Sequence, residues 1–203
     1  MSYVTVLGVD CGLANFGWAM VRLAKPWEVL ALGTIRTKDG TSAAGVTASS
    51  DLSRRAREVH RQLRALCDEH GWPSVICAEA HSYPRVPRKG GKACPVCKSQ
   101  GSSIAVKALA QLNRGWGVVD ALANQLHDLP IVEASPQAIK ATMCGRANAT
   151  KGQVQKALQD MFGATLLDGL NKGEREHAAD ALGAVVACKN TSAMQMARRQ
   201  AAA

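Results

Sequence analysis

Long apolar runs are missing from this sequence of 203 residues, and no run approaches the roughly 20 residues that a membrane-spanning helix needs. The amino terminus has no basic stretch and its apolar run stops at Asp10, so we expect no signal peptide. The seven cysteines are an odd and scattered set, unlike the dense cysteines of a small secreted scaffold. These absences predict a cytoplasmic protein that does not enter a membrane.

Acidic residues are outnumbered, with 16 Asp and Glu against 25 Lys and Arg and a net charge of +9. Such an excess favours a polyanionic partner, and without a membrane segment nucleic acid is the better match. The length suits one hydrophobic core. We therefore expect a single domain over residues 1–190, followed by a frayed, Ala-rich tail over 191–203.

Hydrophobic periodicity predicts an α/β fold with a mixed sheet flanked by helices. Three antiparallel strands are expected to open the chain, and later strands are expected to add in parallel. Ser135 followed by proline, and Thr150 followed by Gln153 at capping-box spacing, predict two helix starts. The strands are expected at 4–9, 18–23, 28–35, 74–78 and 131–133, and the other helices at 54–70, 104–126 and 174–188.

A basic inserted loop is expected over residues 85–103. Six basic residues and no acidic ones lie between positions 85 and 107, and without them the net charge falls to +3. Deleting residues 88–102 should therefore weaken nucleic-acid binding and flatten its salt dependence. The candidate DNA-binding residues of this loop are Arg85, Arg88, Lys89, Lys92 and Lys98.

The same loop carries Cys94 and Cys97, which have the spacing of half a zinc site. Structural zinc needs about four ligands. The others would come from His81 or from a second subunit; otherwise the segment is a free, flexible basic loop. The sequence leaves these alternatives open.

Four side chains form a candidate metal centre. Asp10 ends the first strand and Glu79 ends the fourth, and ligand sites of such sheets gather at strand ends. His177 and Asp180 are three residues apart, so they share one face of a helix. Taken singly, Asp10 suits a hairpin turn, Glu79 suits a solvated strand edge, and Asp180 suits the first turn of a helix. Together they are the side chains that a phosphodiesterase needs to bind divalent metal ions.

Six sequence blocks follow one another along nearly the whole chain: residues 8–13, 33–38, 133–136, 151–155, 177–182 and 193–196. In this order they resemble the RuvC family of Holliday junction resolvases. The resemblance implies a ribonuclease-H-like fold and a homodimer that nicks two strands of a four-way DNA junction symmetrically. It also implies Mg²⁺ or Mn²⁺, two ions per active site, held by the acidic set Asp10, Glu79, His177 and Asp180.

The resemblance also assigns roles around the metal centre. Lys140 and Lys151 match family lysines near the active site and would contact phosphate, although both also suit a solvated helix. Arg146 is a candidate backbone contact, and Tyr83 a candidate wedge that unstacks bases or else a packed loop aromatic. Many members have aspartate at the position of His177. An imidazole there suits Mn²⁺ better than Mg²⁺.

Three other functions fit parts of the sequence. An actin-like phosphotransferase also uses an Asp-x-Gly turn between two opening strands, but it needs a second Gly-rich phosphate loop, and ATP hydrolysis would reveal it. A junction-binding module without catalysis would have lost part of the acidic set. A phage- or plasmid-type nuclease of the same fold would act on flaps or other branched DNA.

Overall fold

The structure, a computed structural model, describes residues 4–80, 85–87, 102–104, 106–125 and 129–202. A five-stranded mixed sheet runs through its centre in the order β3-β2-β1-β4-β7. The first three strands are antiparallel, and β4 and β7 add in parallel, as predicted. The strands are β1 (Thr5–Asp10), β2 (Asn15–Arg22), β3 (Glu28–Arg36), β4 (Pro73–Glu79) and β7 (Ile131–Ala134).

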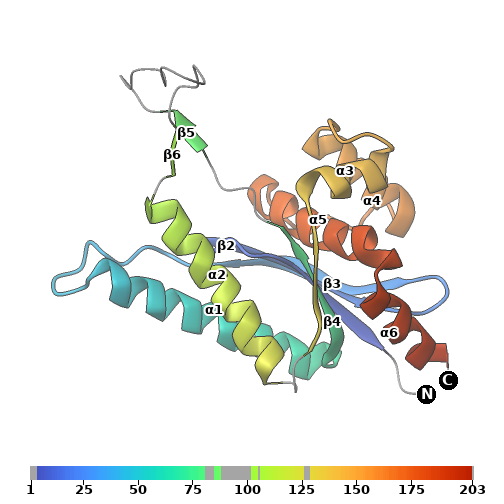
Figure 1. The fold of residues 1–203 in the computed structure, drawn as a ribbon, viewed down its shortest axis with the longest axis horizontal. Coiled ribbons are helices and arrows are strands. Elements are labelled where there is room, and N and C mark those ends of the chain that lie inside the picture. Colours follow the sequence, from blue (N-terminus) through green and yellow to red (C-terminus); the bar gives the residue numbers. More distant parts are fainter. Residues whose placement is uncertain (1–3, 81–84, 88–101, 105, 126–128, 203) are drawn as a thin grey trace, which may run out of the picture.

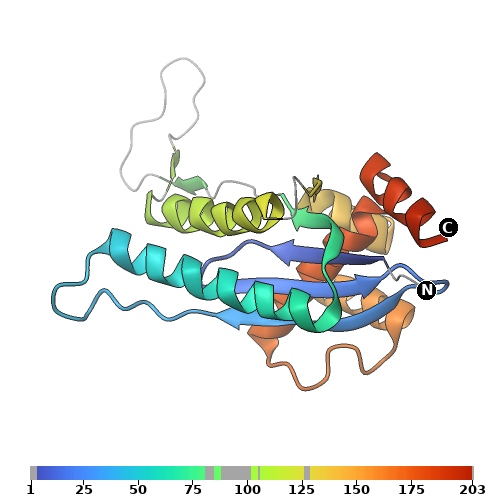
Figure 2. The same cartoon turned by 90° about the horizontal axis from the view of Figure 1, so that it is seen from below.

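Helices cover both faces of this sheet (Figures 1 and 2). Alternate residues of a strand point to opposite faces. Val6 of β1 therefore packs in the core beneath α5, and Leu7 packs in a second core beneath α1 and α2. In the described part of the chain, no helix has the length and apolar character that crossing a bilayer demands. One face carries α1 (Ala48–His70) and α2 (Val106–Asn124); the other carries α3 (Pro136–Cys144), α4 (Lys151–Phe162), α5 (Lys172–Ala187) and α6 (Ser192–Ala202).

Side-chain caps begin the helices where the sequence predicts them. The Ser135 hydroxyl accepts the backbone N–H of Ala138 at 3.1 Å, and Thr150 forms a capping box with Gln153. The start of α1 is different, since it begins at Ala48 rather than at residue 54. Its first turns bury charged residues instead of apolar ones, so apolar periodicity does not reveal them.

The inserted segment begins and ends as a short antiparallel pair. Strand β5 (Arg85–Pro87) pairs with β6 (Ser102–Ile104), and α2 follows at Val106. The prediction that a helix starts at residue 104 is therefore wrong, because that residue pairs in a strand. The predicted zinc half-site lies outside the described residues, together with the wedge and most of the basic loop; these are Tyr83, Arg88, Lys89, Lys92, Cys94, Cys97 and Lys98, with His81.

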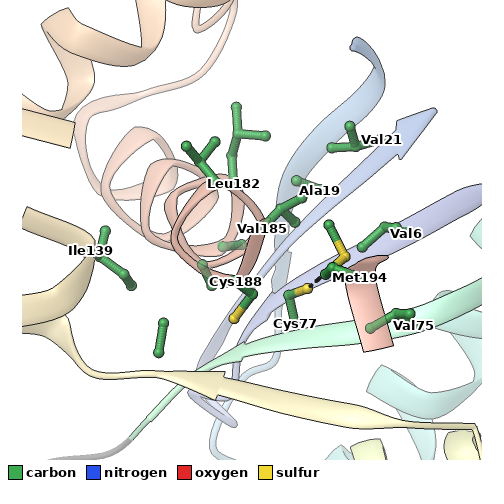
Figure 3. Close-up of a cluster of buried hydrophobic side chains, with 14 of the residues drawn as sticks. Val6, Ala19, Val21, Val75, Cys77, Ile139, Leu182, Val185, Cys188 and Met194 are labelled. Carbon is green, nitrogen blue, oxygen red and sulfur yellow. Dashed lines mark hydrogen bonds between the residues drawn. The ribbon is translucent and has the colours of Figure 1, made fainter. Parts of the chain in front are cut away.

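The carboxy-terminal segment is helical, so the prediction of a frayed tail is wrong for residues 192–202. Met194 and Ala197 of α6 are buried. The Cys77 thiol of β4 lies 3.8 Å from the Met194 sulfur (Figure 3). Burying a methionine side chain stabilises by about 1.5–3 kcal/mol, so Met194 contributes to holding α6 against the sheet.

Candidate active site

Two carboxylates lie at the same edge of the sheet because β1 and β4 are parallel neighbours. Asp10 is the last residue of β1, and Glu79 is the last residue of β4. The register pairs Val9 with Ala78, one position before each acid. Asp10 is buried and Glu79 is partly buried. The expectation that both acids meet at strand ends is thus met by the geometry.

Helix α5 brings the third acid to this edge by crossing β1 and β2 at close range (Figure 1). Two glycines permit the approach. A Cβ atom on Gly8 would lie 2.3 Å from the Ala181 carbonyl oxygen, and one on Gly17 would lie 2.1 Å from the His177 carbonyl oxygen. Real Cβ contacts are essentially never shorter than 3.0 Å. Any larger residue at either position would therefore push α5 away from the sheet.

The structure brings three of the four predicted metal ligands into one group. Asp10, Glu79 and Asp180 each offer a carboxylate oxygen, and these oxygens lie within 4.8 Å of one another. His177 meets the group through Asp10, with its Nδ1 atom 2.6 Å from Asp10 Oδ2. Carboxylate oxygens are the ligands that Mg²⁺ and Mn²⁺ prefer. The three acids therefore have the composition and spacing of a divalent-metal centre.

The pKa values of the site reflect burial and crowding of negative charge. Burial raises the pKa of Glu79 to about 8, and the charges of Asp180 and Asp10 add to the effect. Burial also raises the pKa of Asp180, against the opposing charge of Lys151. The hydrogen bond to Asp10 raises the pKa of His177. A bound dication would offset this crowding, so the residues present fit such an ion.

A cavity of about 270 Å³ lies beside the acids, between the strand ends and helices α3 to α5. Its wall carries two ammonium groups, those of Lys140 and Lys151. The Lys151 Nζ atom lies 3.1 Å from Asp180 Oδ2. Acids that can bind metal thus face cations that can bind a phosphate. The lining residues are Asp10, Glu79, Pro136, Ile139, Lys140, Lys151, Val154 and Asp180.

Two of the predicted DNA-binding residues lie on other segments of the chain. Arg146 is exposed in the connection between α3 and α4 and is not part of the cavity wall. Arg85 belongs to β5, but its side chain is not described. Glu176 was missed by sequence reasoning, although its carboxylate lies 3.3 Å from Lys151 Nζ. Its one sequence signal is its position next to His177 in the His-x-x-Asp motif.

Replacing Gly17 by alanine is expected to weaken Mn²⁺ binding by about 10- to 100-fold, the scale seen when support of metal ligands is lost. The added Cβ meets backbone that cannot rotate away, so the first part of α5 must shift relative to Asp10. Titration calorimetry measures the affinity. Gly117→Ala on α2 is the matched control, because a Cβ there meets nothing within 4 Å. Equal affinities for the two variants would contradict this role of Gly17.

Comparison with known proteins identifies sequence relatives along most of the chain. No family model matches the sequence. The crossover junction endodeoxyribonuclease RuvC of Thermomicrobium roseum is 26% identical over 181 residues, which are 89% of this chain and 90% of that protein. The RuvC of Chlamydia abortus is 25% identical over 93% of this chain and 95% of its own length. That of Syntrophomonas wolfei is 29% identical over 90% and 86%.

Solved structures share the fold. The Thermus thermophilus RuvC structure matches with a TM-score of 0.62 at 16% identity, covering 91% of this chain and 92% of that one. The yeast mitochondrial Holliday junction resolvase matches with a TM-score of 0.60 at 15% identity, covering 97% and 81%. The ribonuclease-H-like fold is thereby confirmed. Related sequences along about nine-tenths of the chain, together with this fold, show that the chain belongs to the RuvC family.

Proposed function

We propose that this chain is a metal-dependent endodeoxyribonuclease that resolves four-way DNA junctions by paired, symmetric nicks. The observation that carries the proposal is the convergence of Asp10, Glu79 and Asp180 from β1, β4 and α5 on one cavity. The relatives are named crossover junction endodeoxyribonucleases, and a matching Thermus thermophilus RuvC structure is a complex with a Holliday junction substrate. The acid cluster matches that chemistry.

The three carboxylates would hold Mg²⁺ or Mn²⁺, two ions per site, and we include His177 in the ligand set because its ring contacts Asp10. Bound ions of this kind activate water and stabilise the leaving oxygen of an in-line displacement. The protein supplies the fixed ligand geometry. Lys140 and Lys151 would attract and orient the scissile phosphate, since both face the cavity.

Paired nicking requires two active sites on one junction, so the working form would be a homodimer with one site in each protomer. The net charge of +9 suits the DNA partner. The sequence relatives described above come from bacteria, and we place the activity in a bacterial cytoplasm, encoded by the cell, a phage or a plasmid. Arg146 and the basic residues of the 85–103 insertion would add contacts to the DNA backbone.

Cleavage of three labelled substrates tests the proposal. A four-way junction, a flap and a linear duplex of matched sequence are incubated with equal concentrations of Mg²⁺ or Mn²⁺. We expect symmetric nicks in the junction and none in the duplex, and Mn²⁺ should support at least the rate seen with Mg²⁺ because of His177. Equal cutting of the flap would favour a general branched-DNA nuclease. ATP hydrolysis without cleavage would favour a phosphotransferase.

The affinity for Mn²⁺ is expected to rise with pH, by about tenfold per pH unit up to about pH 8. The pKa of Glu79 is raised from 4.5 to about 8, so between these values the metal-free folded protein holds a proton that binding must release. By the same linkage, the free energy of unfolding of the metal-free protein should fall as pH rises through this window. Calorimetry in buffers of different ionisation enthalpy counts the released protons. If the Mn²⁺ affinity of Glu79→Gln still rises with pH by about tenfold per unit, the released proton does not come from Glu79.

A further inference from the structure

Lys151 is shared between two carboxylates of α5. It is the first residue of α4, and its Nζ atom lies 3.1 Å from Asp180 Oδ2 and 3.3 Å from Glu176 Oε2. Glu176 and Asp180 are four residues apart on α5, so they present their carboxylates on one face of the helix. The ammonium group thus bridges a proposed metal ligand and a neighbouring acid.

The two carboxylates are not equivalent. Asp180 belongs to the three-acid group, and its side chain is 17% exposed, whereas Glu176 lies outside that group and is 34% exposed. Within the part of the chain that the structure describes, the polar contact of the Glu176 side chain is with Lys151, and the capping box of α5 uses Glu174 instead. Glu176 therefore does not cap α5, and among the described residues its ionic contact is the one with Lys151.

A divalent ion at Asp180 and an ammonium group 3.1 Å from the same carboxylate compete for its charge and repel each other. Without a second acid, Lys151 would either oppose the ion or swing away from the cavity. With Glu176 at 3.3 Å, a small movement of a flexible side chain keeps the ammonium group at the rim. The cavity can then hold the ion and a phosphate-facing cation together.

We propose that Glu176 is a positioning residue that retains Lys151 at the rim of the cavity when Asp180 binds a divalent ion. The role rests on the proposed function for its use in cleavage, but its effect on metal binding does not depend on that function. Glu176 acts through Lys151, so every consequence of removing it should depend on that lysine.

A double-mutant cycle on Mn²⁺ affinity tests this dependence, read from the electron paramagnetic resonance signal of free Mn²⁺. Glu176→Gln should weaken binding by about fivefold in the wild-type background, the size of a typical contact coupling. In a Lys151→Gln background the same change should have no effect, and Lys151→Gln alone should tighten binding. Asp160→Asn, which removes the exposed partner of Lys156 on the same α4, is the control and should change nothing.

Equal weakening in both backgrounds would mean that Glu176 attracts the ion by its own charge, and the proposal would be overturned. No weakening in the wild-type background would overturn it as well. Thermal unfolding checks that Glu176→Gln leaves stability unchanged, and a matching loss of stability would assign Glu176 to the fold instead.

Cleavage kinetics separate this proposal from the proposed function. At saturating Mn²⁺, Glu176→Gln should lower the turnover rate on a four-way junction with little change in KM, and should add no further loss to Lys151→Gln. If the effect of Glu176→Gln on Mn²⁺ affinity depends on Lys151 but the protein cuts no junction, the positioning role of Glu176 stands and the proposed nuclease function is refuted. If the protein cuts the junction but the effect of Glu176→Gln on Mn²⁺ affinity does not depend on Lys151, the nuclease function stands and the positioning role is refuted.

Discussion

Asp10→Asn is expected to lower the rate of junction cleavage by about 10³-fold or more while junction binding is retained. Asp10 lies within 4.8 Å of both other acids and contacts His177, so its charge is central to the metal group. A bound metal ion stabilises such a transition state by several kcal/mol, and each 1.36 kcal/mol changes the reaction rate by a factor of ten. Asparagine keeps the shape of the side chain but removes its charge.

Single-turnover cleavage of a labelled four-way junction measures this loss, and a gel mobility assay in Ca²⁺ measures binding. Asp160→Asn is the matched control, because Asp160 is an exposed acid of α4 that pairs with Lys156. It should cleave as the wild type does. Cleavage by Asp10→Asn within tenfold of the wild-type rate would place the metal centre elsewhere.

Asp51→Ala is expected to lower the free energy of unfolding by about 3–5 kcal/mol, the usual cost of leaving a buried charge without its partner. Asp51 and Arg55 are each 2% exposed, and their charged atoms lie 3.8 Å apart in the first turns of α1. Arg55 Nε also donates to the Thr37 hydroxyl at 2.8 Å, and Asp51 accepts the Gly40 N–H at 3.1 Å. The pair therefore ties α1 to the segment that follows β3.

Urea unfolding followed by circular dichroism measures this cost. Arg54→Ala is the control: Arg54 also binds the Asp51 carboxylate but is 52% exposed, so its loss should cost less than about 1 kcal/mol. The double variant Asp51→Leu with Arg55→Met should recover much of the loss, since no buried charge is left alone. If Asp51→Ala and Arg54→Ala cost the same, burial of the pair is not what makes it important.

Local signals in the sequence predicted most elements well. Caps such as Ser135 and Thr150 satisfy backbone N–H groups within three residues, so their helix starts can be predicted without any knowledge of the fold. The opening strands could be predicted because their apolar runs end at turn residues. The start of α1 could not, since Asp51 and Arg55 are buried there by partners distant in sequence.

Errors arose where pairing or burial depends on distant residues. Ile104 continues the apolar pattern of the following helix, yet residues 102–104 pair with 85–87 across an intervening segment. The Ala-rich end of the chain has weak periodicity, and only the apolar surface around Cys77 makes Met194 a core residue (Figure 3). Neither outcome is encoded within a few residues of the segment concerned.

For the site, sequence patterns are enough to predict which side chains lie at strand ends and on the His-x-x-Asp face of α5, because strand and helix periods are local properties. The tertiary structure decided that the acids converge, through the parallel register of β1 with β4 and the close approach of α5 at Gly8 and Gly17. It alone decided that Glu176 meets Lys151, because that contact joins two helices whose packing depends on the whole core.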